Sequence, residues 1–173
     1  MSAFWNLDKA KANKAGQSDF IQGNSQLTLK IISAGWIAKQ NNTGGQNYAL
    51  DLYVMNESKS TAHLTLWYGN SAGERWGGEN IVNALMTVCN VPSLSQVQGN
   101  HWQYNFDERK DLQVPMMIAP ELANKAFGAF LAENWYVKEG QPKQAGTNLF
   151  NVYDYQTNQL AWQKNAGQPS DQT

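Results

Sequence analysis

The sequence has little of what a disulfide framework or a metal motif requires. Among its 173 residues there are one cysteine, Cys89, and two histidines, His63 and His101. A single thiol cannot form an internal disulfide, and two histidines with one cysteine are poor material for a metal site. The sequence therefore predicts no disulfide, no metal site and no cofactor.

Charge is also scarce. Thirteen Lys and Arg face fourteen Asp and Glu, so the net charge is −1, and charged residues make up 16% of the chain, against about 25% in an average domain. Amides supply the missing polarity, with 19 Asn and 16 Gln. This composition excludes a polybasic tail, a coiled coil and a charge-rich disordered chain. It does not exclude nucleic-acid binding, which depends on local clusters of Lys and Arg.

Long hydrophobic runs are absent as well. No apolar stretch approaches the roughly 18 residues of a membrane span. The first residues, Met1 to Asn6, lack a basic segment followed by an apolar one, which is the pattern of a secretory signal. We therefore expect a protein without a membrane anchor in the cytoplasm.

Alternating apolar and polar residues predict three strands in the first half of the chain. Leu27, Leu29 and Ile31 alternate with polar residues in a strand over 26–32, which continues to 36 through a bulge at Gly35. Residues 48–54 and 63–68 alternate in the same way. The Asn- and Gly-rich turn at 41–45 and the polar residues 56–60 connect the strands. The three strands therefore form an antiparallel meander.

The pattern then changes to a helix and returns to strands. Apolar residues at three- and four-residue spacing predict an amphipathic helix over 80–89. Residues 93–111 predict a short second helix or a long loop. Strands follow over 126–138 and 148–155, joined by a flexible hairpin loop over 139–146.

This order favours a mostly β fold, a five-stranded barrel of the oligonucleotide/oligosaccharide-binding (OB) type with one helix between strands three and four. An α+β sandwich gives a similar order. We assign residues 1–25 to a flexible N-terminal arm, 26–164 to the OB-fold domain and 165–173 to a disordered tail.

No catalytic arrangement is visible, so we predict that the protein is not an enzyme. Cys89 lies at the end of the apolar helical stripe, where a buried structural thiol is expected. His63 and His101 have no partner at a catalytic spacing. The remaining acidic candidates are interleaved with cations and are typical of a solvated charge cluster: Asp107, Glu108, Arg109, Lys110 and Asp111.

Aromatic residues give a stronger indication. Alternation directs Tyr53 and Trp67 to the strand faces opposite the Leu and Val residues. Rings on a barrel surface stack with unpaired bases, and Lys or Arg nearby neutralises phosphates. Large aromatics also fill protein cores, so each ring has that second interpretation. The candidate nucleic-acid-binding residues are Trp36, Lys39, Tyr53, Trp67, Arg75, Trp76, Trp135, Tyr136, Lys138 and Lys143.

The strand segments 27–32, 48–54 and 63–68, the helix 80–89 and the block 124–131 together resemble the small phage-encoded single-stranded DNA-binding proteins with an OB fold. The resemblance covers about residues 26–155, by pattern and not by a motif. It implies a non-catalytic protein in the host-cell cytoplasm that coats or protects single-stranded DNA during phage replication or recombination. Phage or host replication and recombination proteins are the further partners it implies.

One feature departs from that resemblance. Many single-strand binders end in an acidic tail with a hydrophobic tip, whereas this sequence ends Pro169-Ser170-Asp171-Gln172-Thr173. A carbohydrate-binding or virion structural β-domain is the alternative, because exposed Trp and abundant amides suit sugar stacking too. The sequence leaves open DNA against RNA, the site size and the oligomeric state.

Overall fold

The computed structural model describes residues 4–16, 25–57, 59, 61–131, 135–137, 143–145 and 149–166. Strands predominate, as the sequence predicts. In chain order the elements are β1 (Trp5–Asn6), α1 (Lys9–Gly16), β2 (Ser25–Gln40), β3 (Gln46–Met55), β4 (Thr61–Asn70), α2 (Gly78–Val88), β5 (Ser93–Leu94), β6 (Val97–Asn105), β7 (Lys110–Ile118), the 3-10 turn η1 (Pro120–Leu122), β8 (Ala126–Leu131), β9 (Trp135–Val137), β10 (Lys143–Ala145), β11 (Leu149–Tyr153) and α3 (Ala161–Ala166).

The main sheet is antiparallel and is organised around the long strand β2. Its strand order is β11-β8-β2-β3-β4, and β7 and β6 are attached beside this path. One edge of β2 pairs with β3 along residues 30–40, whereas the other edge pairs with β8 over residues 25–30 and with β7 at Gly35. Within the described residues this sheet has seven strands and is not closed, so it differs from the five-stranded barrel expected from the sequence.

The predicted alternation along β3 and β4 is confirmed. Leu50, Leu52 and Val54 are fully buried in the core, and Leu64 and Leu66 join them from the neighbouring strand. The residues between them point to the other side of the sheet. The bulge of β2 lies between Ile31 and Ser33 and not at the predicted Gly35, where the ladder is regular.

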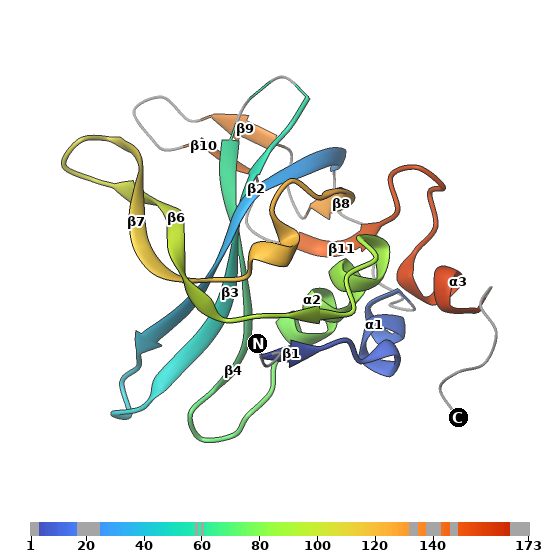
Figure 1. The fold of residues 1–173 in the computed structure, drawn as a ribbon, viewed down its shortest axis with the longest axis horizontal. Coiled ribbons are helices and arrows are strands. Elements are labelled where there is room, and N and C mark those ends of the chain that lie inside the picture. The colour runs from blue at the N-terminus through green and yellow to red at the C-terminus, as the bar shows by residue number, and fades with distance from the viewer. Residues whose placement is uncertain are drawn as a thin grey trace.

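The three helices lie together on one side of the sheet, and the β6–β7 hairpin extends on another side (Figure 1). Helix α2, predicted over 80–89, is buried along almost its whole length because its apolar residues cover the core face. Its neighbour Cys89 is buried, as expected, and burial raises the pKa of its thiol to about 12. None of the helices in the described ranges has both the length and the apolar character that a membrane crossing demands.

Residues 4–16 belong to the folded unit, which corrects the prediction of a flexible arm over 1–25. Strand β1 pairs with β5, and α1 contacts both α2 and α3. Trp5 is buried, and its Nε1 donates a hydrogen bond to Asn83 Oδ1 at 3.1 Å. Trp5 and Ala12 both belong to the core, but the Lys- and Ala-rich sequence around them shows no apolar pattern that would predict this. The rest of the arm, 1–3 and 17–24, lies outside the described residues.

Residues 93–111 differ most from the sequence-based prediction of a helix or loop. They contain β5, β6 and the start of β7, and β6 pairs with β7 from Val97–Ile118 to Asn105–Lys110. At the C-terminus, α3 extends to Ala166, so the predicted tail over 165–173 begins inside a helix. The remainder of that tail lies outside the described residues.

Candidate functional site

A groove lined by aromatic rings lies at the end of the sheet where β2 leads into β3. Its volume is about 470 Å³, and it is lined by Phe4, Trp36, Ile37, Ala38, Tyr48, Tyr68, Arg75, Gln96 and Met117. Phe4 is 45% exposed, although it belongs to a cluster of large rings. An exposed phenylalanine beside a groove is available to a ligand.

The rings of the groove support one another. Phe4 meets Trp36 edge-on with 4.6 Å between ring centroids, and Tyr48 stacks on Tyr68 at 6.2 Å. Behind them, Trp5 meets Tyr68 edge-on at 4.9 Å. Trp36 Nε1 donates to the Ser95 carbonyl at 2.8 Å, which fixes the plane of the indole. The groove is therefore built from rings that packing holds in place.

Arg75 supplies the positive charge of the groove. Its guanidinium lies 5.4 Å from the Tyr68 ring and 5.7 Å from the Trp5 ring, within cation–π range. It also donates to Glu79 at 2.6 Å, and Lys11 pairs with the same carboxylate at 2.7 Å. Burial alone would raise the pKa of Glu79, but the hydrogen bonds from these two cations outweigh it and lower the pKa.

Apart from Tyr53, the predicted binding residues whose positions the structure describes fall into three groups. Trp36 and Arg75 both line the groove, although Trp36 is only 7% exposed. Lys39 is exposed further along β2, and Trp67 and Trp76 are half-buried. Trp135 and Tyr136 lie in β9, which pairs with the strand that contains Lys143. For those three the structure describes the backbone only, and Lys138 lies outside the described residues.

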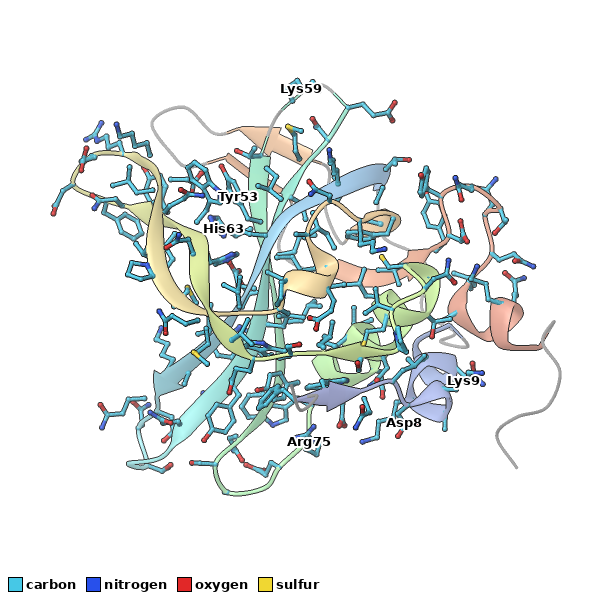
Figure 2. The ribbon with its side chains drawn as sticks, viewed as in Figure 1. Asp8, Lys9, Tyr53, Lys59, His63 and Arg75 are labelled. Atoms are coloured by element: carbon cyan, nitrogen blue, oxygen red, sulfur yellow. The ribbon has the colours of Figure 1, made fainter. Side chains whose placement is uncertain are left out.

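The prediction that Tyr53 offers an open ring is wrong. Its side chain does point away from the Leu and Val core, but it is only 6% exposed. Trp102 of β6 stacks on it with centroids 5.4 Å apart, and the His63 ring lies 4.8 Å away. The β6–β7 hairpin covers this part of the sheet, so the ring is not free for a base. Figure 2 shows Tyr53 and His63 together, far from Arg75.

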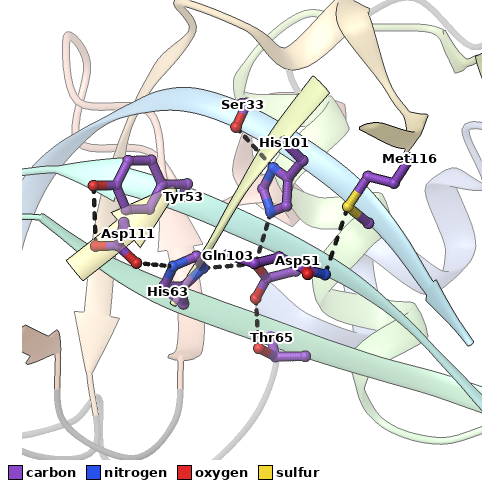
Figure 3. Close-up of polar contacts among 9 residues, drawn as sticks. All are labelled: Ser33, Asp51, Tyr53, His63, Thr65, His101, Gln103, Asp111 and Met116. Carbon is purple, nitrogen blue, oxygen red and sulfur yellow. Dashed lines mark hydrogen bonds and ion pairs between the residues drawn. The ribbon is translucent and has the colours of Figure 1, made fainter. Parts of the chain in front are cut away.

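A polar network lies under that hairpin (Figure 3). Asp51 of β3 is its centre, because Oδ2 accepts from His63 Nδ1 at 2.7 Å and from His101 Nε2 at 2.8 Å. Thr65 donates to the other oxygen at 2.6 Å. The far nitrogens also have partners: Ser33 Oγ lies 2.7 Å from His101 Nδ1, and Asp111 Oδ1 lies 2.9 Å from His63 Nε2.

The network controls the pKa values of its members. Burial would raise the pKa of Asp51, but the hydrogen bonds from His101 and His63 hold it far below its ordinary value. Burial would lower the pKa of His63, yet Asp51 and Asp111 reverse this and raise it. An imidazolium between two carboxylates fits this arrangement.

Sequence reasoning missed this network. It placed His101 in a segment predicted as a short helix or a long loop, and Asp111 in a solvated cluster. Instead, His101 is fully buried in β6, and Asp111 bonds both His63 and Tyr53. Asp51 and His63 share the outer face of adjacent strands, so the alternation could have paired them. Nothing in the sequence showed that the later hairpin would fold over that face.

Comparisons with known proteins do not place the chain in a family: no family model matches it, and a search of curated proteins gives no match.

Proposed function

We propose that this protein binds single-stranded DNA, without catalysing a reaction, through the aromatic groove beside Arg75. The observation that carries the proposal is one groove that holds the exposed Phe4 ring, the half-buried Tyr48 ring and the Arg75 guanidinium. Unstacked bases gain contact energy on aromatic faces, and cations neutralise the phosphates that connect them.

The groove has the dimensions and composition for flat rings. Its volume of about 470 Å³ lies within the range of about 300–1,000 Å³ of small-ligand sites. Phe4 and Met117 are its exposed large apolar residues, at 45% and 37%. A base inserted beside Phe4 would cover apolar surface that water now contacts. Stacking of this kind contributes about 1–3 kcal/mol per base.

The charges nearby suit a phosphate chain more than a neutral sugar. Arg75 faces the groove, and Lys39 is exposed on the strand that forms one of its walls. The backbone edge of β2 beyond Gly35 has no strand partner among the described residues, and the groove follows that edge. A strand of nucleic acid could therefore lie along β2 with bases on the rings and phosphates toward the cations.

The strand order supports an OB-like architecture. In a five-stranded OB barrel the first strand lies between the second and the fourth, and the fifth lies beside the fourth. The order β11-β8-β2-β3-β4 has this arrangement, with α2 between the third and fourth of these strands in the chain. The β6–β7 hairpin is then an insertion after the helix, and it covers the face that an OB fold commonly uses. The aromatic groove, in contrast, is left open by the hairpin.

The test is a fluorescence titration of the wild-type protein with oligo-dT, following the intrinsic tryptophan signal at low and high salt. Phe4→Ala should weaken binding about 5- to 150-fold, the equivalent of about 1–3 kcal/mol of stacking. Phe106→Ala is the matched control, because Phe106 is 80% exposed at the hairpin and does not line the groove.

Each result has a defined meaning. Duplex DNA should bind much more weakly than oligo-dT, because its bases are already stacked. Loss of affinity in Phe106→Ala but not in Phe4→Ala would move the site to the hairpin. No binding of any oligonucleotide, or binding of a neutral sugar that is independent of salt, would reject the proposal in favour of the carbohydrate-binding or structural alternative.

A further inference from the structure

The network beneath the β6–β7 hairpin contains both histidines of the chain. They are far apart in the sequence and lie on different strands, β4 and β6, yet both rings direct one nitrogen at the same carboxylate of β3. His63 Nδ1, His101 Nε2 and an oxygen of Asp51 all lie within 4.8 Å of one another. Two imidazoles and one carboxylate form a donor set that suits zinc and related transition-metal ions.

We propose that Asp51, His63 and His101 bind one first-row transition-metal ion of the Zn²⁺ class, which fastens the β6–β7 hairpin to the sheet. This site is separate from the aromatic groove and does not depend on DNA binding.

The second layer of partners supports the assignment. A metal-bound histidine usually donates its other N–H to a carboxylate or another oxygen, which fixes the ring and its tautomer. Here Asp111 lies 2.9 Å from the far nitrogen of His63, and Ser33 Oγ lies 2.7 Å from that of His101. Thr65 holds the second oxygen of Asp51 at 2.6 Å. All three donor groups are therefore oriented before an ion arrives.

The burial of the three side chains and their access to solvent also suit a bound metal ion. The side chain of His101 is fully buried and that of Asp51 is 5% exposed, whereas His63 is 23% exposed. The His63 side is the route by which an ion would enter, and a fourth ligand such as water would be bound there. Ligand atoms around zinc lie about 3.3–3.4 Å apart at bond lengths of about 2.0–2.1 Å. The present N···O separations of 2.7 and 2.8 Å would thus lengthen by about 0.6 Å as the ion replaces two N–H protons.

The experiment uses the full chain without a histidine tag, stripped with a chelator and then titrated with Zn²⁺ and Co²⁺. We expect one ion per chain by calorimetry, a visible Co²⁺ spectrum of low coordination number and a higher melting temperature with Zn²⁺. His63→Gln removes a ligand and should reduce affinity at least 100-fold. Asp111→Asn disturbs only the outer partner and should reduce it about 10- to 100-fold. Asp107→Asn, an exposed residue of the same hairpin, should bind like the wild type.

Histidine NMR of the wild-type protein tests the same proposal without depending on whether the variants fold. Since the chain has two histidines, histidine NMR signals report on this site alone, and both should shift when one equivalent of Zn²⁺ is added. If neither shifts, or if 100 µM Zn²⁺ and Co²⁺ give no 1:1 binding, the proposal is wrong and the network is held by protons alone. Binding that His63→Gln leaves unchanged would also overturn it.

Discussion

The aromatic groove and the polar network share strands β3 and β4 and differ in almost every physical property. Tyr48 and Tyr68 line the groove, whereas Tyr53 and His63 belong to the network. Tyr48 and Tyr53 lie five positions apart on β3, as do His63 and Tyr68 on β4, and an odd spacing places the two residues of each pair on opposite faces.

The aromatic groove and the polar network differ because the β6–β7 hairpin covers the network and leaves the groove open. The groove retains the exposed Phe4 ring at its mouth, whereas the hairpin closes over the network and leaves His101 without solvent contact. Polar groups that are buried must have partners, and each named member of the network has at least one. The covered face therefore contributes to stability and the open end is available to a ligand.

The largest expected effect is a loss of stability when the polar network under the hairpin is broken. Asp51→Ala removes the acceptor shared by His63 and His101 and leaves a buried ring without its partner. We expect a loss of about 3–5 kcal/mol in the free energy of unfolding, measured by urea denaturation in the presence of a chelator. Asp107→Ala, exposed on the hairpin, should change it by less than about 0.5 kcal/mol. A loss below about 1 kcal/mol for Asp51→Ala would mean that the network contributes little.

Hairpin docking can also be disturbed without touching a polar group. A Cβ at Gly35 would lie 2.7 Å from the His101 ring and 2.9 Å from Met116. Gly35→Ala should therefore destabilise the protein by about 1–3 kcal/mol, measured in the same denaturation assay. Gly77→Ala is the matched control, because its Cβ would meet no atom within 4 Å. Equal stability of the two variants would show that the hairpin can move aside at no cost.

The role of the aromatic groove can be tested through the salt dependence of oligo-dT binding. Arg75→Gln removes a cation from the groove, so the slope of log K against log salt for oligo-dT should become shallower by about 0.7. Lys59→Gln changes a cation at the opposite end of β4 (Figure 2) and should leave the slope unchanged. The same slope for Arg75→Gln and the wild type would remove Arg75 from the contacts with phosphate.

The smallest expected effect is on the pH dependence of the melting temperature. The pKa of Glu79 is lowered in the folded protein, so its ion pairs stabilise the fold above the ordinary pKa of 4.5. That stabilisation is lost as the pH falls through the lower, folded-state pKa. Glu79→Gln should lower the melting temperature at pH 7, and the difference from the wild type should shrink steadily as the pH falls below 4.5. A difference that does not change with pH would assign the effect to packing instead of charge.

Much of the sheet could be predicted from the sequence, and the hairpin could not. Strands β2, β3 and β4 have one apolar face each, which produces a clear alternation. In β6 the one buried residue is His101, so no apolar stripe marks the strand. Because the buried side chain of β6 is a polar histidine, the strand has no apolar alternation, and its sequence looks like that of a loop.

The site was predictable to a similar extent. Trp36 and Arg75 were predicted as binding residues, and both line the groove. Phe4 was missed because it lies in a segment interpreted as an arm. Tyr53 was misjudged because its partner Trp102 lies 49 positions later in the sequence. Local patterns give the face of a strand, but only the tertiary fold shows what covers that face.

The division of one edge of β2 between two partners has a consequence for how the chain folds. The first half of that strand pairs with β8, and Leu29 faces Phe127, about 100 positions later. At a synthesis rate of about 5–20 residues per second, β8 is synthesised roughly 5–20 s after β2, and the first half of β2 lacks its strand partner during that time. The β2–β3–β4 meander can form first from local contacts, whereas the pairing of β2 with β8 closes a long loop and is slow. During that interval the unpaired edge is the part of the molecule most exposed to association with another chain.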